Sequence, residues 1–151
     1  ENGDFIVMDF GALYKGYHAD MTRTVVVGSA SDKHNEIYNI VLESQLAGIA
    51  YAKSGVRCCD LDKACRDVID NKGYGELFMH STGHGLGLEV HTMPRISWMN
   101  ENLLEENNVI TIEPGIYIAG WGGVRIEDDC LITKDSCKPM NRSTKELVVV
   151  G

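Results

Sequence analysis

The chain has 151 residues, 44% of them hydrophobic, so it can bury a core of its own and its composition excludes a disordered segment. Its 14 Lys and Arg residues against 22 Asp and Glu residues give a formal net charge of −8, which argues against nucleic acid and an anionic membrane surface as partners. No apolar run approaches the roughly 20 residues that a membrane-spanning helix needs.

Two strands are expected first. Residues Asp4–Phe10 form a short, mainly apolar run that is typical of a buried strand. Residues Asp20–Gly28 contain a β-branched series that favours a second strand. A glycine-containing, turn-like segment at Tyr14–Tyr17 lies between the two, so we predict that they form a hairpin.

Two amphipathic helices follow. Apolar residues recur at helical spacing from Ser31 to Tyr51, and Ser29 or Ser31 is available as the N-cap residue. A second helix is predicted from about Asp60 to Asn71, with Gly73 as a stop signal.

The remainder of the chain is predicted as strands separated by glycines. Together with the hairpin and the helices, these strands indicate an α+β fold in which an antiparallel sheet is covered by helices. No repeat, linker or low-complexity block divides the chain, so residues 1–151 are treated as a single domain. The expected strands are Gly83–His91, Asn108–Glu113, Ile116–Ala119, Val124–Thr133 and Glu146–Val150.

The cysteines favour a reducing compartment. Their number, five, is odd, and none of them forms a CxxC pair or a Cys/His spacing typical of a zinc site. We therefore expect a soluble, cytoplasmic protein.

Several carboxylates occur where apolar strands are predicted. Asp9 and Asp20 lie inside or beside such strands, and a buried carboxylate needs a compensating cation. Either residue could instead cap backbone amides in a turn or at a sheet edge. Glu113 directly precedes Pro114 and Gly115, a turn that would present its side chain at the end of a strand.

A further carboxylate, Glu127, belongs to the segment VRIEDD. Strand alternation predicts one face with Val124, Ile126 and Asp128, and a second face with Arg125, Glu127 and Asp129. The second face would carry an arginine and acids. Taken alone, Glu127 fits the solvent-facing side of such a strand equally well.

Three of the five histidines, His80, His84 and His91, occur in the segment MHSTGHGLGLEVH. The glycines between them allow a neighbouring group or ligand to approach the backbone closely. A single histidine is as readily a hydrogen-bonded structural residue, and that alternative stays open for His80.

Taken as a set, one imidazole and four carboxylates suit two divalent ions of the Mn, Co, Fe or Zn kind. A carboxylate can bridge two ions and an imidazole cannot. A site rich in acids therefore favours a pair of ions over one tetrahedral zinc.

Four motifs follow one another along the chain, namely MDFGALYKGYHADMTRT (Met8–Thr24), GHGLGLEVH (Gly83–His91), TIEPGIY (Thr111–Tyr117) and GVRIEDD (Gly123–Asp129). In this order they resemble the motifs of the pita-bread metallopeptidases, in the branch of Xaa-Pro dipeptidases and aminopeptidase P. The methionine aminopeptidases resemble the chain less well, because their second histidine motif usually reads FHE where this sequence has EVH. The resemblance covers nearly the whole chain and implies a pita-bread (creatinase/aminopeptidase-like) fold of the α+β class.

The resemblance also implies a role for each candidate residue. The metal ligands would be Asp9 on one ion, Asp20 and Glu127 bridging both ions, and His84 and Glu113 on the second. Glu113 would in addition shuttle a proton, and His80 and His91 would contact the peptide and the developing charge. Arg125 and Tyr117 would lie near the substrate. The implied cofactor is a pair of divalent ions, Mn²⁺ first, with Co²⁺, Zn²⁺ or Fe²⁺ as alternatives.

The implied reaction is hydrolysis of the Xaa-Pro bond by a metal-bridging hydroxide, on a peptide with proline at its second position. Two alternatives remain, a catalytically inactive pita-bread module that binds peptides or proteins, and a methionine aminopeptidase-like enzyme. The presence of all five ligand positions favours a peptidase. The resemblance further implies that the chain is the C-terminal part of a longer, homodimeric protein and lacks its N-terminal elements. Activity is therefore expected of that longer protein rather than of this segment alone.

Overall fold

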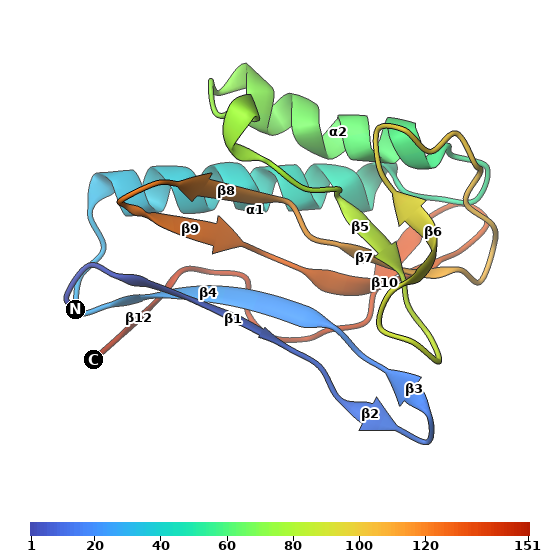
Figure 1. Ribbon diagram of the computed structural model, residues 1–151, viewed down its shortest axis with the longest axis horizontal. Helices are drawn as coiled ribbons and strands as arrows, with labels where there is room; N and C mark the ends of the chain where they lie inside the picture. Colours follow the sequence, from blue (N-terminus) through green and yellow to red (C-terminus); the bar gives the residue numbers. More distant parts are fainter.

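The computed structural model describes residues 1–151 and has the strands and helices of an α+β fold (Figure 1). The strands form two larger sheets, with the orders β1-β4-β12 and β11-β10-β7-β5-β6, and two small hairpins, β2-β3 and β8-β9. The elements are β1 (Phe5–Phe10), β2 (Leu13–Tyr14), β3 (Tyr17–His18), β4 (Met21–Val27), α1 (Asp32–Tyr51), α2 (Cys58–Asn71), the 3-10 helix η1 (Gly75–Leu77), β5 (Gly83–Gly85), β6 (Thr92–Ile96), β7 (Val109–Ile112), β8 (Gly115–Ile118), β9 (Gly122–Arg125), β10 (Asp128–Ile132), β11 (Cys137–Pro139) and β12 (Val148–Val150).

The first two predicted strands form the expected hairpin. β1 and β4 pair antiparallel from Phe5 opposite Val26 to Phe10 opposite Met21, and the β2–β3 turn projects beyond them (Figure 1). The prediction that β1 is buried is wrong, because every β1 residue after Phe5 is exposed. β1 is an edge strand that pairs only with β4, whereas β4 lies between β1 and β12 and is largely buried.

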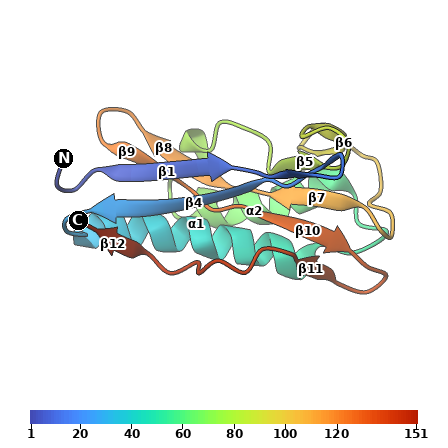
Figure 2. The ribbon, with the colours of Figure 1, turned by 90° about the horizontal axis from the view of Figure 1, so that it is seen from below.

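The sheet that contains β4 is mixed rather than purely antiparallel. β12 pairs parallel to β4, with Val148 opposite Val25. Figure 2 shows β12 beside β4, and both chain termini lie at the same end of the molecule.

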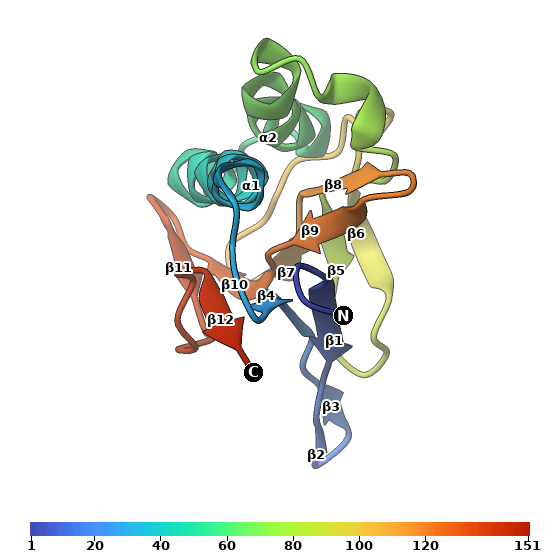
Figure 3. The same ribbon diagram turned by 90° about the vertical axis from the view of Figure 1, so that its left-hand side faces the viewer.

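The two predicted helices are present, and they lie side by side on one side of the strands (Figure 3). The hydroxyl of Ser31, not that of Ser29, caps α1 by accepting a hydrogen bond from the His34 backbone N–H. Gly48 of α1 permits the close approach of α2, because a Cβ at this position would lie 2.4 Å from Cys65 Sγ. The second helix begins two residues before the predicted Asp60.

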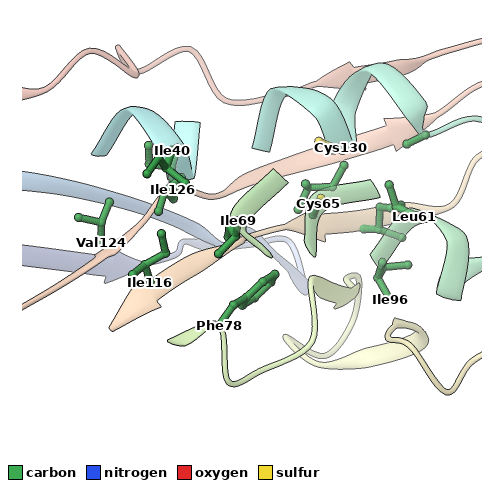
Figure 4. Packing of buried hydrophobic residues seen from close by; sticks show 14 of the residues in the cluster. Ile40, Leu61, Cys65, Ile69, Phe78, Ile96, Ile116, Val124, Ile126 and Cys130 are labelled. Carbon is green, nitrogen blue, oxygen red and sulfur yellow. The ribbon is translucent and has the colours of Figure 1, made fainter. Parts of the chain in front are cut away.

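The hydrophobic core fills the space between the helices and the strands. It comprises 19 buried residues, and Figure 4 shows Leu61 and Ile69 of α2 among side chains from the strands. No helix is both long and apolar enough to cross a membrane. All five cysteines are free.

Two predicted strands are interrupted. Gly83–His91 is a strand only over β5, because the chain then turns outward and returns as β6. Val124–Thr133 is divided into β9 and β10 at residues Ile126 and Glu127. At this break the backbone N–H of Glu127 donates to the Thr22 carbonyl oxygen at 3.1 Å, so the chain leaves its pairing with β8 and continues beside β7.

Candidate metal centre

The five predicted ligands come together where several strands end. Asp9 is near the end of β1, Asp20 directly precedes β4, and His84 is the central residue of β5. Glu113 follows β7, and Glu127 occupies the break between β9 and β10. Their donor atoms form two overlapping groups within which all atoms lie within 4.8 Å of one another, namely Asp9, Asp20 and Glu127; and His84, Glu113 and Glu127. A third such group joins Asp20 and His84 to His91, which was not predicted as a ligand.

The imidazole lies between carboxylates. His84 Nε2 is 3.2 Å from Glu113 Oε1 and 3.6 Å from Asp20 Oδ2. Its Nδ1 is 3.0 Å from the Gly85 carbonyl oxygen, which fixes the ring orientation. This arrangement leaves Nε2 to face the acids, as expected of a ligand whose second nitrogen is held by the backbone.

Glu127 is the most buried of these acids, with 1% of its surface exposed. The solvent-facing alternative for this residue is therefore wrong. The break in the strand turns the side chain inward, against the alternation expected of one continuous strand.

The clustered acids repel one another. Burial, followed by the charge of Glu113, raises the pKa of Glu127 to about 8. Burial and the charge of Asp9 also raise the pKa of Asp20. Burial would lower the pKa of His84, but its hydrogen bond and charge interactions with Glu113 outweigh this and raise it to about 9. Burial and mutual repulsion make the charged forms of Glu127 and Asp20 costly in free energy, and a bound divalent cation would relieve this cost, so the donor set fits metal ions.

Asp9 differs from the other predicted ligands because its side chain is 53% exposed. It does not cap backbone amides. Its carboxylate forms an ion pair with Arg125, which reaches it from the end of β9.

Arg125 links three parts of the centre. Besides Asp9, its guanidinium donates to Tyr117 Oη at 3.0 Å and to Thr22 Oγ1 at 3.1 Å. The Thr22 hydroxyl in turn donates to Glu127 Oε2 at 2.5 Å. Arg125 thus contacts the predicted ligand Asp9 directly and the predicted ligand Glu127 through Thr22, and its place near the substrate stays a prediction.

Sequence reasoning missed the polar residues that hold these ligands. The Thr111 hydroxyl donates to Glu113 Oε1 at 2.9 Å and accepts a hydrogen bond from the His84 backbone N–H at 3.0 Å. The Asp129 carboxylate accepts the Asp20 N–H at 3.1 Å. Spacing could have identified both threonines, because Thr22 and Thr111 lie two residues from Asp20 and Glu113 and hence on the same strand face.

The two remaining predicted histidines differ in their surroundings. Both ring nitrogens of His80 have partners, the Ser81 carbonyl oxygen at 2.8 Å and Tyr117 Oη at 2.9 Å. The ring of His91 is exposed, and its centroid is 4.3 Å from that of His84. His91 therefore lies close to the predicted ligand His84. Its predicted contact with the substrate did not require this position.

A cavity of about 720 Å³ opens onto the centre. The predicted residues in its wall are Asp9, His80, His84, His91, Glu113 and Arg125. Tyr117 is not among the lining residues, and its hydroxyl contacts two residues that are, His80 and Arg125; its position near the substrate stays a prediction. Sequence reasoning missed Glu89 and Arg95, whose charged side chains also line the cavity.

Comparisons with known proteins bear on this geometry. The profile described as Metallopeptidase family M24 matches residues 1–134. The Xaa-Pro dipeptidase of Pyrococcus horikoshii is 53% identical over 98% of this chain and 42% of its own length. Among solved structures, the Xaa-Pro dipeptidase from Bacillus anthracis matches with a TM-score of 0.97 and 52% identity, over 99% of this chain and 42% of that chain.

The X-Pro aminopeptidase from Thermotoga maritima matches as well, with a TM-score of 0.97 and 48% identity over 99% of this chain and 42% of that chain. The chain thus spans less than half the length of these relatives.

Proposed function

Since the chain belongs to metallopeptidase family M24, as its four ordered motifs predicted, we propose that it forms the metal-binding domain of a hydrolase that cleaves Xaa-Pro bonds. The α+β pita-bread fold class is confirmed by the solved relatives. The observation that supports metal-dependent chemistry is that the donor atoms of all five predicted ligands fall into overlapping groups.

The proposed cofactor is a pair of divalent ions. Asp9, Asp20 and Glu127 form one group, and His84, Glu113 and Glu127 form another, so Glu127 is common to both. A shared carboxylate is what two neighbouring ions require. Because most donors are carboxylate oxygens, Mn²⁺ is the first candidate.

When bound, two such ions would lower the pKa of water and polarise the carbonyl group of the substrate. Glu113 lines the cavity, and its Oε1 is held by Thr111, so its carboxylate is oriented to accept and return a proton. His91 is exposed and lines the cavity, where it can donate a hydrogen bond to the developing oxyanion.

The identity of the substrate rests on the relatives named for Xaa-Pro peptides. A proline imide has no N–H and a fixed φ, so the cavity must accept a ring instead of pairing an amide. The proposed enzyme therefore differs from a methionine aminopeptidase-like enzyme in requiring proline after the scissile bond.

The test uses the full-length protein with Mn²⁺. We expect elemental analysis to find about two ions per chain and hydrolysis of an Xaa-Pro dipeptide or a longer Xaa-Pro peptide, with little activity on a Met-Ala peptide. Preference for the dipeptide or for the longer peptide separates the two Xaa-Pro activities. A protein that binds metal and peptide without hydrolysis would be the inactive module, and preference for Met-Ala would favour the methionine aminopeptidase alternative.

His91→Ala tests the role proposed for this histidine. Removing a well-placed donor to an oxyanion lowers kcat by about 10²- to 10³-fold, and we expect this loss while both ions are retained. The measurement is kcat together with metal content. A parallel loss of metal would make His91 a ligand instead, as its proximity to His84 and Asp20 also permits.

A further inference from the structure

An ion pair on α2, with a buried carboxylate and a partly buried guanidinium, lies outside the candidate metal centre. Asp62 is fully buried, and its carboxylate pairs with Arg66 one turn later, with Oδ2 3.0 Å from Nε and Oδ1 3.1 Å from Nη2. Desolvating such a pair costs about as much free energy as the attraction returns, so stability alone is a weak reason for it. The contacts that both side chains make with another segment suggest a different role.

The segment is the stretch of chain from Phe78 to Thr82. Arg66 donates to the carbonyl oxygen of Phe78 at 2.8 Å and to that of His80 at 2.9 Å. Asp62 accepts the N–H of Thr82 at 3.0 Å. One ion pair therefore holds three backbone groups within five residues.

Other contacts keep the guanidinium in place. It lies over the ring of Phe78, with a centroid distance of 4.2 Å, and 5.1 Å from the ring centroid of Trp98. A guanidinium with its fork occupied by two carbonyls and its face by an aromatic ring has little freedom to move.

This segment carries His80 into the wall of the cavity. Residues 79–81 belong to no helix or strand, so no ladder of backbone hydrogen bonds sets their position. The ring of His80 reaches Tyr117 Oη at 2.9 Å, and Tyr117 is itself bound by Arg125 of the metal centre. The backbone position of residue 80 therefore decides where this ring lies relative to the ligands.

We propose that Asp62 and Arg66 are positioning residues that set the place of His80 in the substrate cavity, without a part in holding metal. The proposal rests on the function proposed above. Its consequence is a dependence of catalysis on a helix that itself contributes neither a predicted ligand nor a residue to the cavity wall.

The test replaces Arg66 by lysine in the full-length protein. Arg66→Lys keeps a cation beside buried Asp62 but removes the fork that binds two carbonyls. Arg57→Lys is the matched control, because Arg57 pairs with Asp60 at the exposed start of the same helix and touches no part of the segment. We expect Arg66→Lys to lower kcat/KM on an Xaa-Pro peptide about 10- to 100-fold, as small displacements of a positioning group do, with metal content unchanged.

A double-mutant cycle with His80→Ala separates positioning from general stability. If Arg66 acts through His80, Arg66→Lys should cause no further loss of kcat/KM in the His80→Ala background. An equal loss in both backgrounds, or a loss of bound metal, would overturn the proposal. Asp62→Asn, which retains an oxygen for the Thr82 N–H, enters the same cycle if Arg66→Lys does not fold.

A readout that needs no activity keeps this inference distinct from the proposed function. In the ¹H–¹⁵N spectrum of the metal-free protein, with the His80 signals identified by their loss in His80→Ala, Arg66→Lys should shift the ring resonances of His80 and leave those of His84 unchanged. Unchanged His80 resonances would refute the positioning role. Absence of Xaa-Pro hydrolysis by the wild-type protein, with the His80 shift present, would refute only the proposed function.

Discussion

Two buried threonine hydroxyls orient the two glutamates of the candidate metal centre. Each donates to one carboxylate oxygen and accepts from one N–H group, with Thr22 between Glu127 and Arg125, and Thr111 between Glu113 and the His84 backbone. Partners of this kind fix the ligand rotamer before metal arrives. Sequence motifs predicted the ligands, and spacing places each threonine on the strand face of an acid, but only the structure shows which carboxylate each hydroxyl contacts.

Thr111→Val removes this hydroxyl while keeping the shape of the side chain. We expect Mn²⁺ affinity to fall about 10- to 100-fold, as is typical when such a partner of a ligand is lost. Isothermal titration calorimetry measures it, with Thr111→Ser expected to retain affinity and Thr133→Val, at an exposed turn, as the matched control. Wild-type affinity in Thr111→Val would show that Glu113 needs no such support.

Among the elements, β5 and β7 determine how closely His84 and Glu113 approach one another. The strands pair through Gly85 and Ile110, and Gly83 is packed so tightly that a Cβ there would lie 2.0 Å from the Thr111 carbonyl oxygen. The sequence indicated that these glycines allow a close approach. It did not indicate that the neighbour is a strand backbone rather than a ligand.

Gly83→Ala should therefore push the two strands apart. We expect a loss of about 1–3 kcal/mol in the free energy of unfolding, the usual cost of overpacking, together with weaker metal binding. Urea unfolding with and without Mn²⁺ measures both effects. Gly87→Ala is the control, since a Cβ there meets no atom within 4 Å, and equal losses in the two variants would contradict the steric argument.

The strand break at Ile126 and Glu127 is a feature that side-chain periodicity along the sequence does not predict. Alternation predicts one strand through VRIEDD, and the segment does have extended chain on both sides of the break. The break arises because Glu127 bonds the backbone and side chain of Thr22 in another sheet. A pattern read along one segment contains no information about such a partner.

For the molecule as a whole, the concentration of acids makes metal-free stability depend on pH. Glu127, His84 and Asp129 have pKa values raised to about 8, about 9 and about 6 in the folded state. Between its lower unfolded pKa and its folded pKa, each group binds a proton more strongly in the folded chain. The free energy of unfolding must therefore fall as the pH rises through this range.

We predict that the thermal midpoint of the metal-free protein decreases from about pH 5 to about pH 9. Glu127→Gln should flatten this dependence and raise the midpoint at pH 8, since it removes the most buried carboxylate charge among the predicted ligands. Differential scanning calorimetry in the presence of a chelator measures both. A midpoint that is constant or rises over this range would contradict the raised pKa values.

Metal should reverse the trend. Ions bind deprotonated carboxylates and neutral imidazole, so the stabilisation by Mn²⁺ should increase with pH over the range in which the metal-free protein weakens. Calorimetry of the Mn²⁺-loaded protein over the same pH series checks this. An equal decline with and without metal would place the acids outside the metal site.

Apolar side chains are exposed on β1 and on β2. Phe10, Leu13 and Tyr14 are more than half exposed, although large apolar side chains favour burial.

The expectation of a longer, homodimeric protein stays a prediction, and so does the cytoplasmic location.

The sequence by itself determined the family, the α+β class, the two helices and the residues that form the candidate centre. These features depend on local periodicity and on short motifs, and each of these can be recognised within a single segment of the chain. The tertiary structure decided that β1 is an exposed edge strand, where the strand at Glu127 breaks, and which hydroxyls and ion pairs contact the predicted ligands and the segment that carries His80. The physical reason is distance along the chain: Thr22 and Glu127 are 105 residues apart, and only folding brings their side chains into contact.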